Sequence, residues 1–259
     1  MSIASEISRL QTAKANLKTS IENKGVTVPS NATLDSYSSY VDGISQGLSS
    51  ISVKDYGFKF QYSTFSSLPS FLDFSECTDF QNMFSACSNL SDLSNLNTSS
   101  ATNMTLCFLN CTSLITCPSL DTSNVTSVVG MFDLCSNLTT VNELDFSKVT
   151  MCDSSLYKFL GGCNNLLNLG GFKDYGKAFL TSVAANYTSY TLDLAGTSDY
   201  LPPSNQNISH DSLMNVINKL YDIATKGCNT QKLILASSNL ARLSASEIAI
   251  ATNKGWTVS

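Results

Sequence analysis

A 24-residue repeat in the middle of the chain constrains the fold more than any other feature of this sequence. Four copies of a Leu-x-x-Ser segment start at the same interval, at Leu72, Leu96, Leu120 and Leu144. An aromatic position keeps that interval inside the copies, at Phe84, Phe108 and Phe132. Several positions held in register indicate a repeat architecture, in which each unit stacks on its neighbour and buries a shared core.

A second pattern inside each copy predicts what the repeating unit looks like. Apolar residues recur at every third position, as in Leu114, Cys117 and Leu120. This skeleton and a period of 24 residues are typical of leucine-rich repeats. The predicted fold class is therefore an α/β repeat, a leucine-rich-repeat solenoid with one short parallel strand and one helical return in each unit. We expect Leu120 to be buried in the stacked core.

A cysteine follows the aromatic position in each copy and should form a structural ladder. The residues are Cys87, Cys111, Cys135 and Cys163, the last of them four residues late. Equivalent positions of stacked units lie in a row, where a small apolar side chain suits a tight bend. Zinc sites usually use pairs two to four residues apart, and the chain has no Cys-x-x-Cys. We expect buried free thiols, with disulfides and a metal site as the alternatives.

The repeats resemble the BspA-like leucine-rich repeats. The matching residues are Met131-Phe-Asp-Leu-Cys-Ser-Asn-Leu138, followed by Leu144-Asp-Phe-Ser-Lys-Val-Thr150. The resemblance covers about residues 65 to 169. Members of this family occur in bacterial surface proteins and in phage-encoded proteins, so the resemblance implies an adhesive or binding role without naming a ligand.

The N-terminal segment predicts a helix of about 20 residues. Its apolar residues follow a heptad spacing, which Lys14 interrupts: Ile3, Ile7, Leu10, Leu17 and Ile21. Gly25 should end this helix, and a second short helix is expected over about residues 34 to 44. The apolar stripe either packs within its own domain or docks and oligomerises as a coiled coil, with a trimer as one arrangement. Three heptads do not decide between the two.

The same segment also resembles a module of phage tail and tail-fibre proteins. The resemblance lies in the Ile-rich helix, Lys24-Gly-Val26, Val28-Pro29 and Leu34-Asp-Ser-Tyr37. It implies that residues 1–48 attach or oligomerise the protein. Residues 49–169 then hold the repeats, and residues 170–259 form a strand-helix cap that shields the end of the core.

The C-terminal part departs from the repeat but keeps clear element signals. Short apolar runs at 192–194 and 233–235 predict strands. Ser209 precedes an amphipathic helix that runs through Leu213 to Leu220. Ser244 and Glu247 have the spacing of a capping box, which predicts a last short helix.

Nothing in the sequence predicts an active site or a cofactor site. The single histidine, His210, stands at a predicted helix start, and the motifs of hydrolases and nucleotide-binding enzymes are absent. Asp73, Asp121 and Asp145 recur with Asn97 in the same slot, each two residues before a Ser or Thr. This spacing favours turns, in which the side chain accepts a backbone amide hydrogen bond, over acid-base catalysis or a cation site.

The amino-acid composition excludes some classes of partner. Only 14% of the residues are charged and the formal net charge is -5, which does not fit a basic nucleic-acid-binding surface. No apolar run approaches the roughly 18 residues of a membrane span, and the first 21 residues lack the apolar stretch of a secretory signal. We therefore expect synthesis in a host cytoplasm, no membrane insertion and no nucleic-acid partner.

The functional prediction is a non-enzymatic part of a phage virion, such as a tail fibre, baseplate or appendage component. It would bind other virion proteins and a host receptor through polar residues between the strand leucines. The predicted binding face consists of Asp92, Asn95, Thr116, Ser119, Thr140 and Glu143. Such a face suits protein or glycan, although a glycan receptor would favour exposed aromatic residues. The alternatives are a bacterial cell-surface adhesion protein and a glycan-active enzyme.

Overall fold

The computed structural model describes two compact units of the chain. It describes residues 3–23, 28, 51–53, 60–70, 72–151, 158–180, 191–195, 207–226 and 229–259. The first unit consists of residues 1–52 and 69–73, and the second of residues 53–68 and 74–259. Each unit is described by itself.

The first unit contains the predicted N-terminal helix. Helix α1 spans Ile3–Glu22, which confirms the helix expected from the heptad spacing. On that stripe Ile21 is buried, whereas Leu17 is 40% exposed. Strand β1 (Ile51–Ser52) pairs in parallel with β2 (Leu72–Asp73). The expected helix cap at Gly25 and the second helix over residues 34 to 44 lie outside the described residues.

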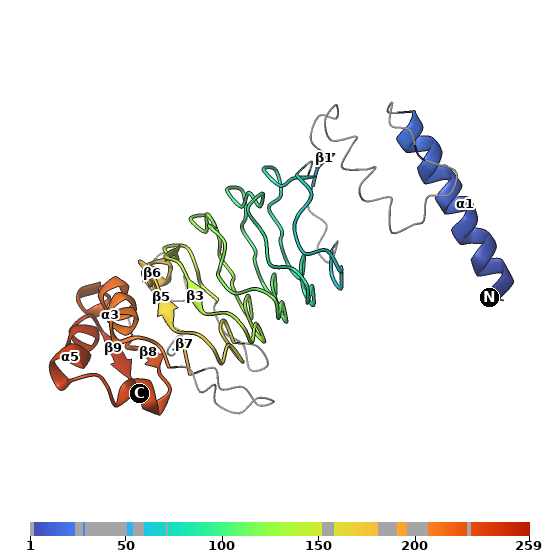
Figure 1. Ribbon diagram of the computed structural model, residues 1–259. Helices are drawn as coiled ribbons and strands as arrows, with labels where there is room; N and C mark the ends of the chain where they lie inside the picture. Colours follow the sequence, from blue (N-terminus) through green and yellow to red (C-terminus); the bar gives the residue numbers. More distant parts are fainter. Residues whose placement is uncertain are drawn as a thin grey trace. The chain divides into compact units, whose positions relative to one another are not determined.

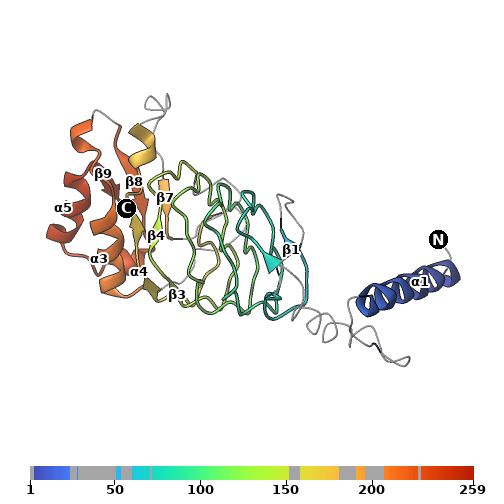
Figure 2. The ribbon, with the colours of Figure 1, turned by 90° about the horizontal axis from the view of Figure 1, so that it is seen from above.

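The second unit begins with a stack of coils that follow one another at the sequence period. Figure 1 shows these coils side by side, from cyan to yellow along the chain, and Figure 2 shows them from above. The same backbone bond recurs between neighbouring coils: the Phe84 amide donates to the Cys107 carbonyl (2.9 Å), and the Phe108 amide donates to the Met131 carbonyl (2.9 Å). The coils are therefore layers of one hydrogen-bonded stack.

The bends between the strand-like segments are turns rather than the helical returns expected from the sequence. At residues 81–86 the amide donors alternate: Asn82 and Phe84 bond to the next coil, whereas Met83 and Ser85 bond three residues back. An α-helix would direct all of these amides along the chain to the residue four positions earlier. Two positions of this turn also adopt a left-handed backbone conformation, Asn82 (φ 54°) and Ala86 (φ 59°). The prediction of a helical return was wrong for the described coils.

Aromatic rings and leucines fill the interior of the stack. Phe84, Phe108 and Phe132 are fully buried and stack nearly parallel, with ring centroids 5.6 and 5.4 Å apart. Leu114, Leu138 and Leu144 are buried as well. Leu120 is only partly buried, so the expectation that it belongs to the core was wrong.

Short parallel pairings hold the edges of the stack. Isolated bridges join Asp79 to Asn103, Asn103 to Ser127 and Ser127 to Met151. On another edge, β3 (Thr140–Val141) pairs with β5 (Asn168–Leu169), and β4 (Leu144–Asp145) pairs with β6 (Phe172–Lys173). All of these pairings are parallel, as expected where each coil follows the same path as the one before it.

The C-terminal part consists of larger strand-helix units. Its elements are η2 (Lys177–Leu180), β7 (Thr191–Asp193), α3 (His210–Lys219), η4 (Ala224–Lys226), β8 (Gln231–Ile234), α4 (Ser237–Leu240), α5 (Ala245–Asn253) and β9 (Trp256–Val258). A parallel sheet has the order β7-β8-β9. The two strands expected near 192 and 233, the helix after Ser209 and the capping box of Ser244 with Glu247 are confirmed. Strand β9, at Trp256, is an addition.

Helix α3 lies over the last coil of the stack. Ser209, just before the helix, donates its amide hydrogen to Leu167 (2.8 Å), and Leu169 donates its own to the Ser212 hydroxyl (2.8 Å). At the other end of α3, Lys219 accepts the amide hydrogen of Asp174 (3.2 Å). The orange and red segments thus follow directly on the stack in Figures 1 and 2.

Candidate functional site

The residues predicted to form a binding face lie along one edge of the coil stack. Asp92, Asn95, Thr116, Ser119 and Glu143 are exposed and Thr140 is partly exposed. Parallel bridges connect Thr116 to Thr140, and a single groove brings Asp92, Thr116 and Ser119 together. Asn95 and Ser119 share a second groove next to it.

Main-chain hydrogen bonds close the coil junctions on both sides of this groove. On one side, Ser91 donates its amide hydrogen to Ser66 (2.9 Å), and Leu68 donates to Asp92 (3.3 Å). On the other side, Thr139 donates to Ile115 (2.8 Å), and Cys117 donates to Thr140 (2.8 Å). The backbone ladder is therefore intact before and after the groove.

The junction between the two coils that line the groove is open. Between residues 91–93 and 115–117, all of which the structure describes, no backbone hydrogen bond forms. By analogy with its neighbours, this junction would use the Ile115 amide with the Ser91 carbonyl and the Leu93 amide with the Thr116 carbonyl. We call the facing segments 91–98 and 114–121 the open junction.

Two side chains explain why this junction stays open. Thr139 donates its hydroxyl hydrogen to the Ile115 carbonyl across the next junction (3.0 Å), but Ile115 itself has no hydroxyl to reach Ser91. Asn142 donates its side-chain amide hydrogen to the Cys117 carbonyl (3.3 Å), whereas the equivalent position in the open junction is Pro118. Proline has no backbone N–H and no side-chain donor, so it cannot make the equivalent hydrogen bond to the Leu93 carbonyl.

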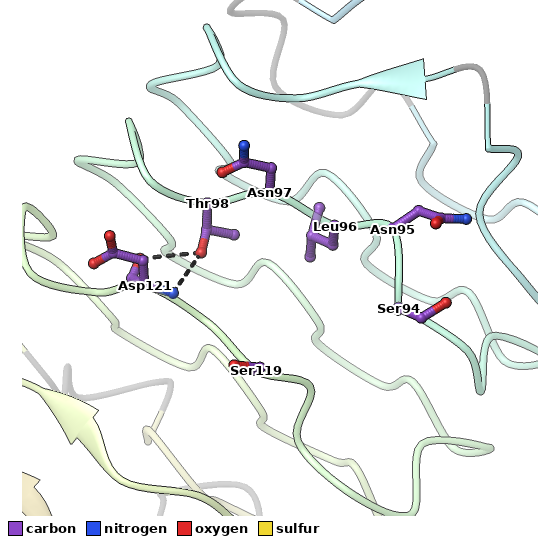
Figure 3. Close-up of a pocket in the computed structure, with 7 residues that line it drawn as sticks. All are labelled: Ser94, Asn95, Leu96, Asn97, Thr98, Ser119 and Asp121. Carbon is purple, nitrogen blue, oxygen red and sulfur yellow. Dashed lines mark hydrogen bonds between the residues drawn. The ribbon is translucent and has the colours of Figure 1, made fainter.

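Both ends of the open junction are closed by side chains. At one end the Thr98 hydroxyl donates to the Asp121 carbonyl (3.0 Å) and accepts the Asp121 amide hydrogen (2.8 Å), as Figure 3 shows. At the other end the Thr112 hydroxyl donates to the Ser88 carbonyl (3.3 Å). The open junction is thus a slot of limited length, which Ser94, Asn95 and Ser119 also line.

The slot carries carboxylates and hydroxyls but no basic side chain. The Ser94 amide donates to the Asp92 carboxylate (2.9 Å), and this bond holds the pKa of Asp92 below its usual range. The Asp121 carboxylate accepts from the amide (3.0 Å) and the hydroxyl (2.7 Å) of Ser123. None of the residues that line the two grooves is Lys or Arg. The slot is therefore weakly acidic and rich in hydrogen-bonding oxygens.

Glu143 differs from the other predicted face residues because it is paired. Lys219 of α3 forms an ion pair and hydrogen bond with its carboxylate. Glu143 therefore helps to hold α3 on the last coils. Thr140 lies one junction beyond the slot, in β3. The structure thus brings four of the six predicted residues to the slot, namely Asp92, Asn95, Thr116 and Ser119.

The structure places the predicted cysteine ladder in the interior. The four residues are free and buried, and each thiol points to the backbone carbonyl of a phenylalanine: Cys87 to Phe60 (2.9 Å), Cys111 to Phe84 (3.1 Å), Cys135 to Phe108 (3.0 Å) and Cys163 to Phe132 (3.0 Å). Burial raises the pKa of each thiol. Protonated thiols can donate to these carbonyls, so the ladder connects successive coils.

The recurring acidic position forms turns. Asn97, Asp121 and Asp145 accept the amide hydrogens of Ser99 (3.0 Å), Ser123 (3.0 Å) and Ser147 (2.9 Å), respectively. This geometry confirms the predicted turn role at these three positions. Asp145 also pairs with Lys173 (2.8 Å).

His210 begins helix α3, and its Nε2 atom lies 2.9 Å from a carboxylate oxygen of Glu247. Among the described residues, no group of three or more His, Cys, Asp or Glu side chains is arranged to hold a metal ion. No helix in the described part of the chain is both long and apolar enough to cross a bilayer.

Sequence reasoning missed the residues that create the slot. Ser91, Ile115 and Pro118 were not predicted, because the prediction rests on the residues that recur. The signal that could have revealed the slot is a residue that departs from the repeat. Ile115 stands where the other copies have Ser91 and Thr139, and Pro118 stands where the next has Asn142.

Part of the chain matches the model of a protein family. Residues 55–166 match the model of a family described as Mycoplasma protein of unknown function, DUF285. The match covers the coils up to Leu166 and is compatible with a BspA-like repeat protein. No curated protein matches the chain, and no solved structure matches it.

Proposed function

We propose that this protein is a non-enzymatic recognition protein of a phage particle, such as a tail-fibre, baseplate or appendage component. In this proposal residues 49–169 form a leucine-rich-repeat solenoid that presents a binding face to a virion protein or a host receptor. The observation that carries the proposal is the open junction. It gathers exposed side chains and unbonded main-chain groups at one place on a stack whose neighbouring junctions are closed.

The remaining parts of the chain have supporting roles in this proposal. Residues 1–48 attach or oligomerise the protein, and residues 170–259 cap the solenoid. The contacts of α3 with the last coil support the cap, because they cover backbone groups of residues 167–174. The resemblance of residues 3 to 44 to a phage tail module supports the attachment role and the virion location.

Labelling of whole particles tests the virion role. Antibodies against the purified protein, applied to purified particles, should place gold label at one defined structure in electron micrographs. Antibody preabsorbed with the protein is the control and should leave the particles unlabelled. Unlabelled particles, or peptides of this chain missing from the particle proteome, would overturn the virion assignment.

A bacterial cell-surface adhesion protein is the second candidate. The match to a family described as a Mycoplasma protein favours it. The same antibodies separate the two candidates, because an adhesion protein would label intact bacterial cells in the absence of phage.

The oligomerisation role rests on helix α1. Leu17 belongs to the heptad stripe and is 40% exposed, so it presents apolar surface that a second copy of the helix would cover. Sedimentation equilibrium should give a mass above that of one chain, and Leu17→Gln should lower it. Asn16→Gln, on an exposed position of the same helix, is the matched control. A wild-type protein that sediments as a single chain at micromolar concentration would contradict this role.

A further inference from the structure

We propose that the open junction is a binding site for a neutral saccharide. This inference rests on the proposed recognition role and names the class of ligand for it. Four main-chain groups carry it: the Leu93 and Ile115 amides and the Ser91 and Thr116 carbonyls, which no group in the described structure satisfies.

The unsatisfied main-chain groups at this site are two donors and two acceptors, so they fit a ligand that both accepts and donates hydrogen bonds. Each of the neighbouring junctions satisfies the same groups within the protein. A buried amide or carbonyl without a partner costs roughly 1–3 kcal/mol, so groups left open at the surface depend on water or a ligand. Sugar hydroxyls donate and accept, and they match a surface that offers both kinds of group beside Ser91, Thr116 and Ser119.

The dimensions of the slot favour a sugar over a peptide strand. A strand inserted between two coils would need twice the usual spacing of about 4.8 Å between its neighbours. The side-chain bonds of Thr98 with Asp121 and of Thr112 with Ser88, at 2.8 to 3.3 Å, hold the coils together at both ends. A sugar ring can lie at the mouth of the slot and send its hydroxyls inward without opening these ends.

Charge selects a neutral saccharide. Asp92 and Asp121 lie along the slot, and its lining residues include no Lys or Arg. An anionic sugar would meet two carboxylates without a compensating cation. Ile115 is 58% exposed, and its neighbours in the sequence, Leu114 and Thr116, line the groove. In this proposal its side chain offers apolar contact to the C–H groups of a sugar ring at the mouth of the slot. It takes the place of the aromatic side chain that the face lacks.

A variant that closes the ladder provides the sharpest test. Ile115→Thr supplies the hydroxyl that Thr139 uses at the next junction, and Pro118→Asn supplies the side-chain amide that Asn142 uses there. In the double variant the new side chains should donate hydrogen bonds to the Ser91 and Leu93 carbonyls, and these bonds should draw the two coils together. Slower hydrogen exchange at the Leu93 and Ile115 amides would show that the junction has closed. Met151→Thr, which replaces an exposed apolar residue elsewhere on the stack, is the matched control.

The measurement is an NMR titration of the full chain with methyl glucoside, methyl galactoside and N-acetylglucosamine. In the wild type, at least one of these sugars should shift the amide signals of Leu93, Ile115 and Thr116. In the closed variant its dissociation constant should rise at least tenfold, and in Met151→Thr it should stay within twofold. Ile115→Thr alone serves the same purpose if the double variant does not fold.

Three results would overturn the inference. They are the absence of shifts with all three sugars, equal binding by the wild type and the closed variant, and stronger shifts with sialyllactose or with an extended Ser-Thr peptide than with the neutral sugars. Because the titration uses purified protein, its outcome is independent of where the protein sits. Particles that label with antibody but protein that binds no sugar would refute the inference alone.

Discussion

At the scale of single residues, each repeated side chain has its own physical task. Phe84, Phe108 and Phe132 fill the interior and stack from coil to coil. Cys111 and its equivalents pack beside them and direct their thiols at phenylalanine carbonyls. These tasks differ, but each requires the equivalent residue of the next coil to lie at the same place. A change at one residue therefore acts on two neighbours at once.

The ring stack gives the first prediction. Phe108→Ala should lower the free energy of unfolding by about 3–5 kcal/mol, since it leaves a cavity between two buried rings. Urea denaturation followed by circular dichroism measures this change. Tyr62→Ala, at an aromatic residue that is 72% exposed, is the control and should change the free energy by about 0.5 kcal/mol or less. Equal losses in the two variants would contradict the stacked core.

At the scale of elements, the unit of the stack is a coil held by alternating bonds. Every second amide of a turn bonds to the next coil, and the amides between them close the turn locally. The row of thiols lies at the end of each turn, directly after a left-handed residue such as Asn110 (φ 58°) or Leu134 (φ 63°). A thiolate at these positions would be a buried charge, which the folded protein disfavours. The stability of the fold therefore depends on pH through this row of thiols.

The direction of that coupling is a second prediction. Burial raises the pKa of Cys111, Cys135 and Cys163 far above the value of about 8.5 in an unfolded chain. The stabilising effect is complete below about pH 8.5 and is lost progressively as the pH rises, because the unfolded state releases its protons first. At pH 10 the loss should reach about 2 kcal/mol for each thiol.

Urea denaturation between pH 7 and pH 10 measures this loss. Cys111→Ala should make the free energy of unfolding fall less steeply with pH than in the wild type, because lysine and tyrosine titration is common to both. An identical slope in the two proteins would contradict a buried, protonated thiol at this position.

The elements with a local signal were predictable from the sequence. Heptad spacing predicted α1, apolar period and a leading Ser predicted α3, and the Ser244–Glu247 pair predicted the start of α5. The turns were not predicted, because every second amide in them bonds to a residue 23 or more positions away. The spacing of Met83, Phe84 and Cys87 also fits one face of a helix, so sequence alone could not exclude a helical return.

The candidate site was predictable in part for a similar reason. Alternation along the coil indicated that Asp92, Asn95, Thr116 and Ser119 would be exposed, and they are. Alternation could not indicate that Glu143 would pair with Lys219, which lies 76 residues further on. Nor could it indicate the open junction, which arises because Ile115 and Pro118 have no side-chain hydrogen-bond donor.

At the scale of the molecule, the repeat determines which backbone groups are left for the proposed binding. Closed junctions satisfy their own backbone groups and leave only side chains for a partner, whereas the open junction also offers amides and carbonyls. Among the described coils, the departure from the repeat at Ile115 and Pro118 thus opens one junction of the stack. The open junction depends on the register of the coils, because it is defined by comparison with the junctions beside it.

Scalar couplings across hydrogen bonds test that register most directly. In a deuterated, ¹⁵N,¹³C-labelled sample, the Phe84 amide should couple to the Cys107 carbonyl carbon and the Phe108 amide to the Met131 carbonyl carbon. The Leu93 amide should show no coupling to the Thr116 carbonyl carbon, although the Leu68 amide should couple to that of Asp92. Couplings of Phe84 and Phe108 to carbonyls four residues earlier in the chain would contradict the coil stack and, with it, the open junction.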